Sequence, residues 1–143
     1  VIDFASRGNM TGMRIRKSMN APVNDITKAA VAAPTSGGNN ADGYAVQFCL
    51  DRLNRMTGNR MLFVISDGQP AGPSPSHMDC DEHLIHVVQN APKDIGVFSV
   101  GIEGYDTSEY YPNAVCVEDS RNLVKESMPV IRRMLRQVKV KVA

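Results

Sequence analysis

Apolar residues along the chain occur in short continuous runs, and these runs predict strands. Met61–Val64 is apolar without interruption, which is typical of a strand covered on both faces of a sheet. Gly96–Ile102 predicts a second buried strand, and Ala114–Val117 predicts a short third one. The chain also opens inside a predicted strand, Val1–Ala5.

Between these runs, apolar residues recur at helical spacing. One helix is predicted from Tyr44 to Met56, because Thr57-Gly58-Asn59 follows as a stop signal. A second is predicted from Asp79 to Asn90, and a closing helix from Ser120 to about Gln137. Ser120 is the expected N-cap of the closing helix, and Pro129 predicts a kink or a restart within it.

Two segments are less regular. Arg7–Gly38 shows weak periodicity, and we interpret it as a connection that contains one helix over Val23–Ala33, capped at or beside Pro22. Lys139–Ala143 is compatible with a frayed end or with an edge strand. Strands that alternate with helices imply parallel crossovers, so the predicted fold class is α/β with an open, doubly wound, mostly parallel sheet.

In such a sheet, functional residues gather at the carboxyl ends of the strands. Ser66 and Asp67 directly follow the Met61 strand, and Gly68 allows a tight turn there. Asn40 and Asp42 lead into the next helix from the same rim. Oxygen ligands of this kind suit Mg²⁺, so Asp67, Asp42, Asn40 and Ser66 are the candidate metal ligands. The alternative is that Asp67 merely caps an ordinary turn.

Composition narrows the classes of partner. The chain has 143 residues, 43% of them hydrophobic, which fits one domain with its own core. A formal net charge of +1 offers no argument for nucleic acid or a membrane as partner. No apolar stretch approaches the roughly 20 residues that span a bilayer, and three scattered cysteines suit reduced thiols. We therefore expect a soluble, cytoplasmic protein.

A second chemistry is suggested by zinc-type ligands at three-residue steps, His77, Cys80, His83 and His86. Along a helix, side chains at this spacing drift around the axis, so all four cannot reach one tetrahedral ion. A pair such as Cys80 with His83, or His83 with His86, could bind one together, but a polar helix face is the simpler interpretation. A hydrolase using Ser66 with one of these histidines is another alternative, although neither a Gly-x-Ser-x-Gly elbow nor a Walker phosphate loop occurs.

Five stretches together resemble the von Willebrand factor A domain of the cobaltochelatase CobT subunit: Asn40–Ala45 (NADGYA), Met61–Pro70 (MLFVISDGQP), Glu82–Leu84 (EHL), Gly96–Ile102 (GVFSVGI) and Tyr105–Val115 (YDTSEYYPNAV). The resemblance implies a metal-ion-dependent adhesion site (MIDAS) that binds Mg²⁺, with Mn²⁺ as an alternative. Asp67 matches the third-loop ligand, and Asn40 or Asp42 matches the second-loop ligand.

The first-loop signature of the family, Asp-x-Ser-x-Ser, is absent from these residues. In the family it follows the central first strand, so we expect the 1–143 domain to be N-terminally incomplete and its metal site to lack ligands. The missing strand belongs to a longer polypeptide in our preferred interpretation; a rearranged sheet or a strand from another copy are the alternatives.

The resemblance also implies a role. Such domains act as non-catalytic adaptors that partner an AAA+ ATPase subunit and a large chelatase-type subunit, and in cobaltochelatase the assembly serves cobalamin biosynthesis. A homo-oligomer is also compatible with the sequence.

Overall fold

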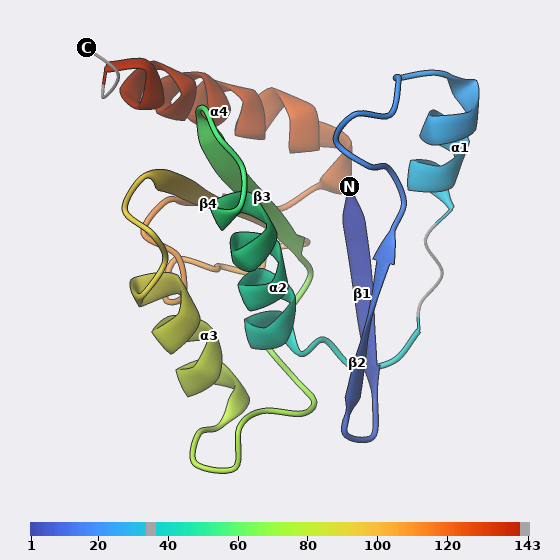
Figure 1. The fold of residues 1–143 in the computed structure, drawn as a ribbon, viewed down its shortest axis with the longest axis vertical. Coiled ribbons are helices and arrows are strands. Elements are labelled where there is room, and N and C mark those ends of the chain that lie inside the picture. The colour runs from blue at the N-terminus through green and yellow to red at the C-terminus, as the bar shows by residue number, and fades with distance from the viewer. Residues whose placement is uncertain (34–36, 141–143) are drawn as a thin grey trace.

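The computed structural model describes residues 1–33 and 37–140 and forms an α/β fold (Figure 1). A short 3-10 turn, Ser120–Asn122, precedes the last helix. The elements are β1 (Ile2–Arg7), β2 (Met10–Ile15), α1 (Asp25–Ala32), α2 (Asp42–Asn54), β3 (Arg60–Ser66), α3 (Cys80–Gln89), β4 (Ile95–Ile102), β5 (Ala114–Val117) and α4 (Leu123–Val140).

The main sheet has the order β3-β4-β5, and all of its strands run parallel. Phe63 pairs with Phe98, and Ser99 pairs with Ala114. The α3 crossover returns the chain so that β4 lies beside β3 in the same direction, which is what parallel pairing requires. The predicted α/β class with a parallel sheet is confirmed.

Helices cover the sheet on both faces. On one face, α2 and α3 pack side by side, and Val46, Leu50 and Leu84 join Val97 of β4 in one buried cluster (Figure 1). On the other face, α4 places Met134 in a second cluster with Phe98 and Val100. Strand β4 is central and covered on both sides, which explains its continuous apolar sequence.

The irregular segment after the first strand contains a strand that the sequence interpretation missed. β2 pairs antiparallel with β1, with Phe4 opposite Met13, and the two form a separate hairpin sheet. Gly8 makes the connecting turn with a positive φ of 56°. β2 shows weak alternation because it is largely exposed and carries polar residues on both faces. The interpretation of this segment as a helix-bearing connection was therefore wrong over Met10–Ile15.

Strand β3 is not buried on both faces as predicted. Phe63 is 37% exposed and Ile65 is 48% exposed. The physical reason is that β3 has a single strand partner, β4, among the described residues. Figure 1 shows the hairpin on the side of β3 away from β4. The hairpin forms a separate sheet, so β3 is an edge strand in the described part of the chain.

Several helix ends differ from the predicted caps. Asn24, rather than Pro22, caps α1, because its side chain accepts from the Thr27 N–H at 3.0 Å. Asp119, rather than Ser120, caps the turn before α4. The predicted start of α3 at Asp79 is confirmed as a capping box with Glu82.

Helix α4 passes through Pro129 without an interruption. Lys139 and Val140 belong to this helix, so an edge strand at these two residues is excluded, and the remaining residues of the predicted tail lie outside the described ones. None of the helices in the described part of the chain has the length and hydropathy needed to cross a membrane.

Candidate functional site

Two loops meet at the carboxyl end of β3. The Asn40 side chain donates from Nδ2 to the Gln69 carbonyl oxygen at 2.9 Å, and the Ala71 N–H donates back to the Asn40 carbonyl oxygen at 2.9 Å. The loop that enters α2 is therefore hydrogen-bonded to the loop that follows Asp67. The rim predicted from sequence exists, and it holds Asn40 and Asp67 on neighbouring loops.

Ser6, at the end of β1, anchors the first of these loops. Its N–H donates to the Asn39 carbonyl oxygen at 2.7 Å, and its carbonyl oxygen accepts from the Asn39 N–H at 3.0 Å. Its buried hydroxyl accepts from the Ala41 N–H at 3.3 Å and hydrogen-bonds Thr11 at 3.0 Å. Sequence reasoning missed Ser6, because a single serine at a strand end carries no recognisable signal.

Asp42 is the first residue of α2 and is only 2% exposed. Its Oδ2 atom is buried and has no hydrogen-bond partner among the described residues. Burial raises the pKa of Asp42 to about 7; the Asn40 side chain and the backbone N–H oppose this rise, and the negative charge of Asp67 adds to it. The start of a helix favours a carboxylate, but here the cost of burial exceeds that benefit.

Asp67 and Ser66 complete the predicted ligand set at the edge of the same rim. Asp67 is exposed, whereas Asp42 is buried. The Ser66 hydroxyl donates to the Gly68 carbonyl oxygen at 3.1 Å, so its lone pairs remain available to a cation. The buried Asp42 oxygen without a described partner and the exposed Asp67 carboxylate are oxygen ligands of the type that a divalent cation takes, so the residue types fit Mg²⁺.

A second buried polar atom lies near this site. The Tyr111 hydroxyl is buried without a hydrogen-bond partner among the described residues. Burial raises the pKa of Tyr111, with the charge of Asp42 as the next contribution. Tyr111 therefore stays protonated, and its side chain places a neutral hydroxyl group close to Asp42.

His83 of α3 packs against the first turn of α2. Its ring packs against Gly43, where a Cβ atom would lie 2.8 Å from His83 Cγ. The ring also meets Tyr44 edge to face, with 4.6 Å between centroids. Burial lowers the pKa of His83, followed by the charges of His86 and His77. His83 is therefore a neutral packing residue that helps to position Asp42.

The zinc alternative finds no assembled site. Within residues 1–33 and 37–136, no three His, Cys, Asp or Glu side chains converge on a point that could hold a metal ion. The Cys80 thiol donates to the Gly72 carbonyl oxygen at 3.0 Å, and Asp81 accepts from the Tyr110 hydroxyl at 2.9 Å. The α3 segment is thus a polar helix face with structural contacts.

The hydrolase alternative is also unsupported by the geometry. The Ser66 hydroxyl donates to a main-chain carbonyl, and no hydrogen bond joins it to a histidine in the described part of the chain. His83, the buried histidine, packs against Gly43 and Tyr44 instead. The nucleophile and base that such a reaction needs are not brought together.

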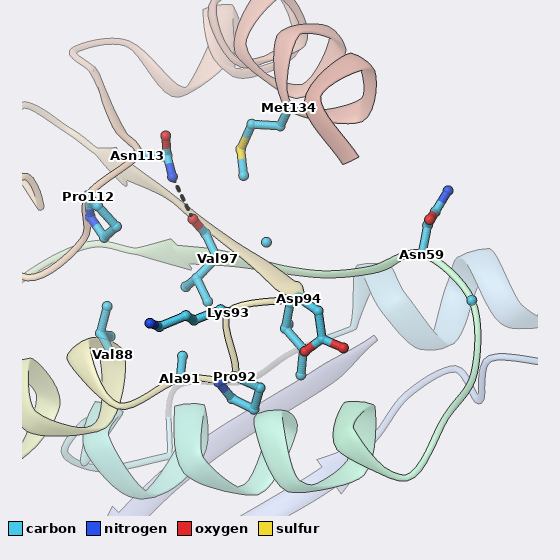
Figure 2. Close-up of a pocket in the computed structure, with 13 residues that line it drawn as sticks. Asn59, Val88, Ala91, Pro92, Lys93, Asp94, Val97, Pro112, Asn113 and Met134 are labelled. Carbon is cyan, nitrogen blue, oxygen red and sulfur yellow. Dashed lines mark hydrogen bonds between the residues drawn. The ribbon is translucent and has the colours of Figure 1, made fainter. Parts of the chain in front are cut away.

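A cavity with a volume of about 700 Å³ lies at the opposite end of the sheet (Figure 2). Its walls come from segments that precede β3 and β4, including Asn59 and Lys93, and from Met134 of α4. Figure 2 shows Met134 pointing toward Val97 across this space. None of the predicted metal ligands lines the cavity, so it is separate from the rim.

Comparison with protein families identifies a family for this chain. The family described as the VWA domain of the cobalamin biosynthesis protein CobT matches residues 4–137, a span that contains Asn40, Asp42, Ser66 and Asp67. Neither the search of curated proteins nor the search of solved structures found a match.

Proposed function

The chain belongs to the family of CobT VWA domains of cobalamin biosynthesis, and from this premise we propose that it is a metal-dependent protein-interaction adaptor. In this proposal, Asp67, Asp42, Asn40 and Ser66 hold Mg²⁺, with Mn²⁺ as the alternative ion. The partners are an AAA+ ATPase subunit and a large chelatase-type subunit, and the location is the cytoplasm. The domain itself is non-catalytic and couples the other subunits.

The observation that carries the proposal is the buried Oδ2 of Asp42, which has no hydrogen-bond partner among the described residues and lies at the rim shared with Asp67. Burying an ionised carboxylate with one oxygen unpartnered costs several kcal/mol, and the raised pKa of Asp42 reflects that burial. A divalent cation held by Asp42 and Asp67 would offset the burial penalty of Asp42 and the repulsion that Asp67 exerts on it. The expected ion is Mg²⁺, because carboxylate, amide and hydroxyl oxygens are hard ligands.

Each residue at this rim has a different role in the proposed site. Asp42 supplies buried negative charge, Asp67 supplies exposed negative charge, and the hydrogen bond from Asn40 to Gln69 holds the two loops together. When bound, the ion would offer an open coordination position to a carboxylate of the partner. Such a charge-assisted contact is strong and specific in a partly desolvated setting.

Metal binding can be tested on the chain itself. We expect thermal unfolding at pH 7.5 to shift upward in Mg²⁺ or Mn²⁺ relative to EDTA. At a metal concentration of about 100 times Kd, the stabilisation is about 2.7 kcal/mol, which corresponds to a rise of roughly 5–10 °C for a domain of this size.

Two variants locate the effect, and a third is the matched control. Asp67→Ala and Asp42→Asn should each remove the metal-induced rise. Asp51→Ala, which changes an exposed carboxylate at the far end of α2, should retain it. A wild-type melting temperature that is the same in EDTA and in saturating metal would contradict the proposal, and so would an equal loss in all three variants.

A further inference from the structure

Strand β5 covers only the carboxyl half of β4. Pairing between the two strands begins at Ser99, which lies opposite Ala114. Residues 95–98 of β4 therefore have no strand beside them on the β5 side in the described part of the chain. These residues form the open edge of β4, and its extent is set by Asn113, where the chain turns into β5.

Two backbone groups of the open edge face the cavity at the amino end of the sheet. In a strand, the N–H and C=O groups of every second residue point to the same side. The Ser99 N–H donates to the Asn113 carbonyl oxygen at 2.9 Å, and the Val97 carbonyl oxygen accepts from Asn113 Nδ2 at 3.2 Å. The Val97 N–H and the Ile95 carbonyl oxygen therefore point to the β5 side, and neither has a hydrogen-bond partner among the described residues.

Both of these residues line the cavity and are almost fully buried. Ile95 is 5% exposed and Val97 is 6% exposed. Buried backbone groups without a partner are uncommon, because they cost free energy comparable to a lost hydrogen bond. An acceptor on one residue and a donor two residues later form a fixed pair along the edge. This pair is complementary to a ligand that carries a donor directly beside an acceptor.

The cavity also has the size and the walls that a flat ring system needs. Its volume of about 700 Å³ lies within the range of small-molecule sites. Figure 2 shows Met134 on one side of Val97, and Val88 and Ala91 on the other. A ring in the plane of the sheet would therefore lie between apolar side chains from α4 and from the end of α3.

We propose that this cavity binds an uncharged planar heterocycle of the adenine type, hydrogen-bonded to the open edge of β4. The exocyclic amine of the ring donates to the Ile95 carbonyl oxygen, and the neighbouring ring nitrogen accepts from the Val97 N–H. The charged residues of the lining, Lys93 and Asp94, have opposite signs, so the lining favours no net charge on the ligand. A ligand without polar groups would leave both backbone groups unpaired.

A heterocycle fits the open edge better than an extended polypeptide does. The Val97 carbonyl oxygen is already paired with Asn113, so the edge offers one acceptor, on Ile95, and one donor, on Val97. A strand gains its affinity from a row of main-chain hydrogen bonds, and two groups make too short a row. Two groups are sufficient to orient a small ring whose remaining surface is covered by apolar side chains.

Binding is tested with adenosine on the chain itself, in EDTA. The cavity shares no residue with the proposed metal site, so a failure of one proposal leaves the other standing. Backbone amides are followed by NMR during the titration. The Val97 amide should shift, and at an adenosine concentration of about ten times Kd its exchange with solvent should slow by roughly tenfold. The Asp67 amide, at the other end of the sheet, should not change.

Two analogues test the hydrogen-bond pair on the unaltered protein. Purine riboside lacks the exocyclic amine, and adenosine with two methyl groups on that amine has no hydrogen to donate. Both keep the flat ring and the sugar. Each should bind at least about tenfold more weakly than adenosine, because the buried Ile95 carbonyl oxygen is then left without a partner.

A pair of variants locates the ligand. Ala91→Leu adds bulk to the cavity wall and should weaken adenosine binding by at least about tenfold. Ala29→Leu makes the same change at an exposed position on α1 and should bind adenosine as the unaltered chain does. Thermal unfolding of both variants checks that they are folded, and the analogue series does not depend on either of them.

The proposal is overturned if adenosine leaves the Val97 amide unchanged, if the dimethylated analogue binds as tightly, or if a folded Ala91→Leu binds adenosine without loss. It is also overturned if a short valine-rich peptide protects Val97 and adenosine does not, because the occupant would then be a polypeptide. Protection of Val97 by adenosine, lost with both analogues and in Ala91→Leu, supports it.

Discussion

The His83 ring occupies the space that a side chain at position 43 would need. A Cβ atom on Gly43 would lie 2.8 Å from His83 Cγ and 2.9 Å from Cε1, closer than real contacts allow. Glycine at the second residue of α2 thus lets α3 approach the helix that carries Asp42. The packing of two helices and the position of a candidate ligand depend on one absent methyl group.

Gly43→Ala should therefore destabilise the fold by about 1–3 kcal/mol, the usual cost of overpacking a buried contact. Unfolding by urea measures the change. Gly12→Ala is the matched control, because a Cβ there would meet the Ala5 carbonyl oxygen at an ordinary 3.8 Å. Adding His83→Ala to Gly43→Ala should recover part of the loss, and strict additivity of the two substitutions would argue against the steric explanation.

The pKa of Asp42 predicts how stability depends on pH without metal. Burial raises this pKa from 3.8 to about 7, so between these values the folded chain binds a proton that the unfolded chain has released. The free energy of unfolding should then fall by about 4 kcal/mol as pH rises from about 4 to 7. Above pH 7, Asp42 should contribute little further change.

Urea unfolding in EDTA across this pH range measures the slope. Asp42→Asn should flatten it, while Asp51→Asn, an exposed substitution on the same helix, should not. A wild-type stability that rises with pH throughout the range, unchanged by Asp42→Asn, would contradict the assignment. Saturating Mg²⁺ should reduce the slope, because the ion favours the charged carboxylate.

Ser6→Ala should loosen the loop that carries Asn40. The substitution removes the acceptor of the Ala41 N–H and the hydroxyl partner of Thr11 in a buried setting. The free energy of unfolding should fall by about 1–3 kcal/mol, hydrogen exchange at Asn39 and Ala41 should become faster, and Mg²⁺ should bind more weakly. Ser76→Ala, at an exposed position, should leave all three quantities unchanged.

Arg60 provides a test at the other end of the sheet. Its guanidinium contacts Asp94 and donates to the Leu53 and Asn54 carbonyl oxygens at the end of α2. Arg60→Ala should cost about 1–3 kcal/mol in urea unfolding, because those interactions involve a half-buried charge. It should leave the affinity for Mg²⁺ unchanged, and a large loss of affinity would show that the two ends are coupled. Arg55→Ala, which is exposed, is the control for stability.

The sequence correctly predicted the elements whose burial in the fold matches the pattern of apolar and polar residues along them. β4 reads as continuously apolar because helices cover both of its faces, and the start of α3 at Asp79 was recognisable because its cap is local chemistry. β2 was missed because an exposed hairpin strand needs no alternation. β3 has the sequence of a strand buried on both faces, but in the described part of the chain it is an edge strand.

Sequence by itself determined which residues are candidates at the rim. Asn40, Asp42, Ser66 and Asp67 lie beside the ends of predicted strands or helices, and this position can be recognised without a structure. Tertiary structure decided their environments. The burial of Asp42, the anchoring of its loop by Ser6 and the packing role of His83 arise from contacts between segments far apart in the chain. Such contacts set desolvation and hydrogen bonding, which no local pattern encodes.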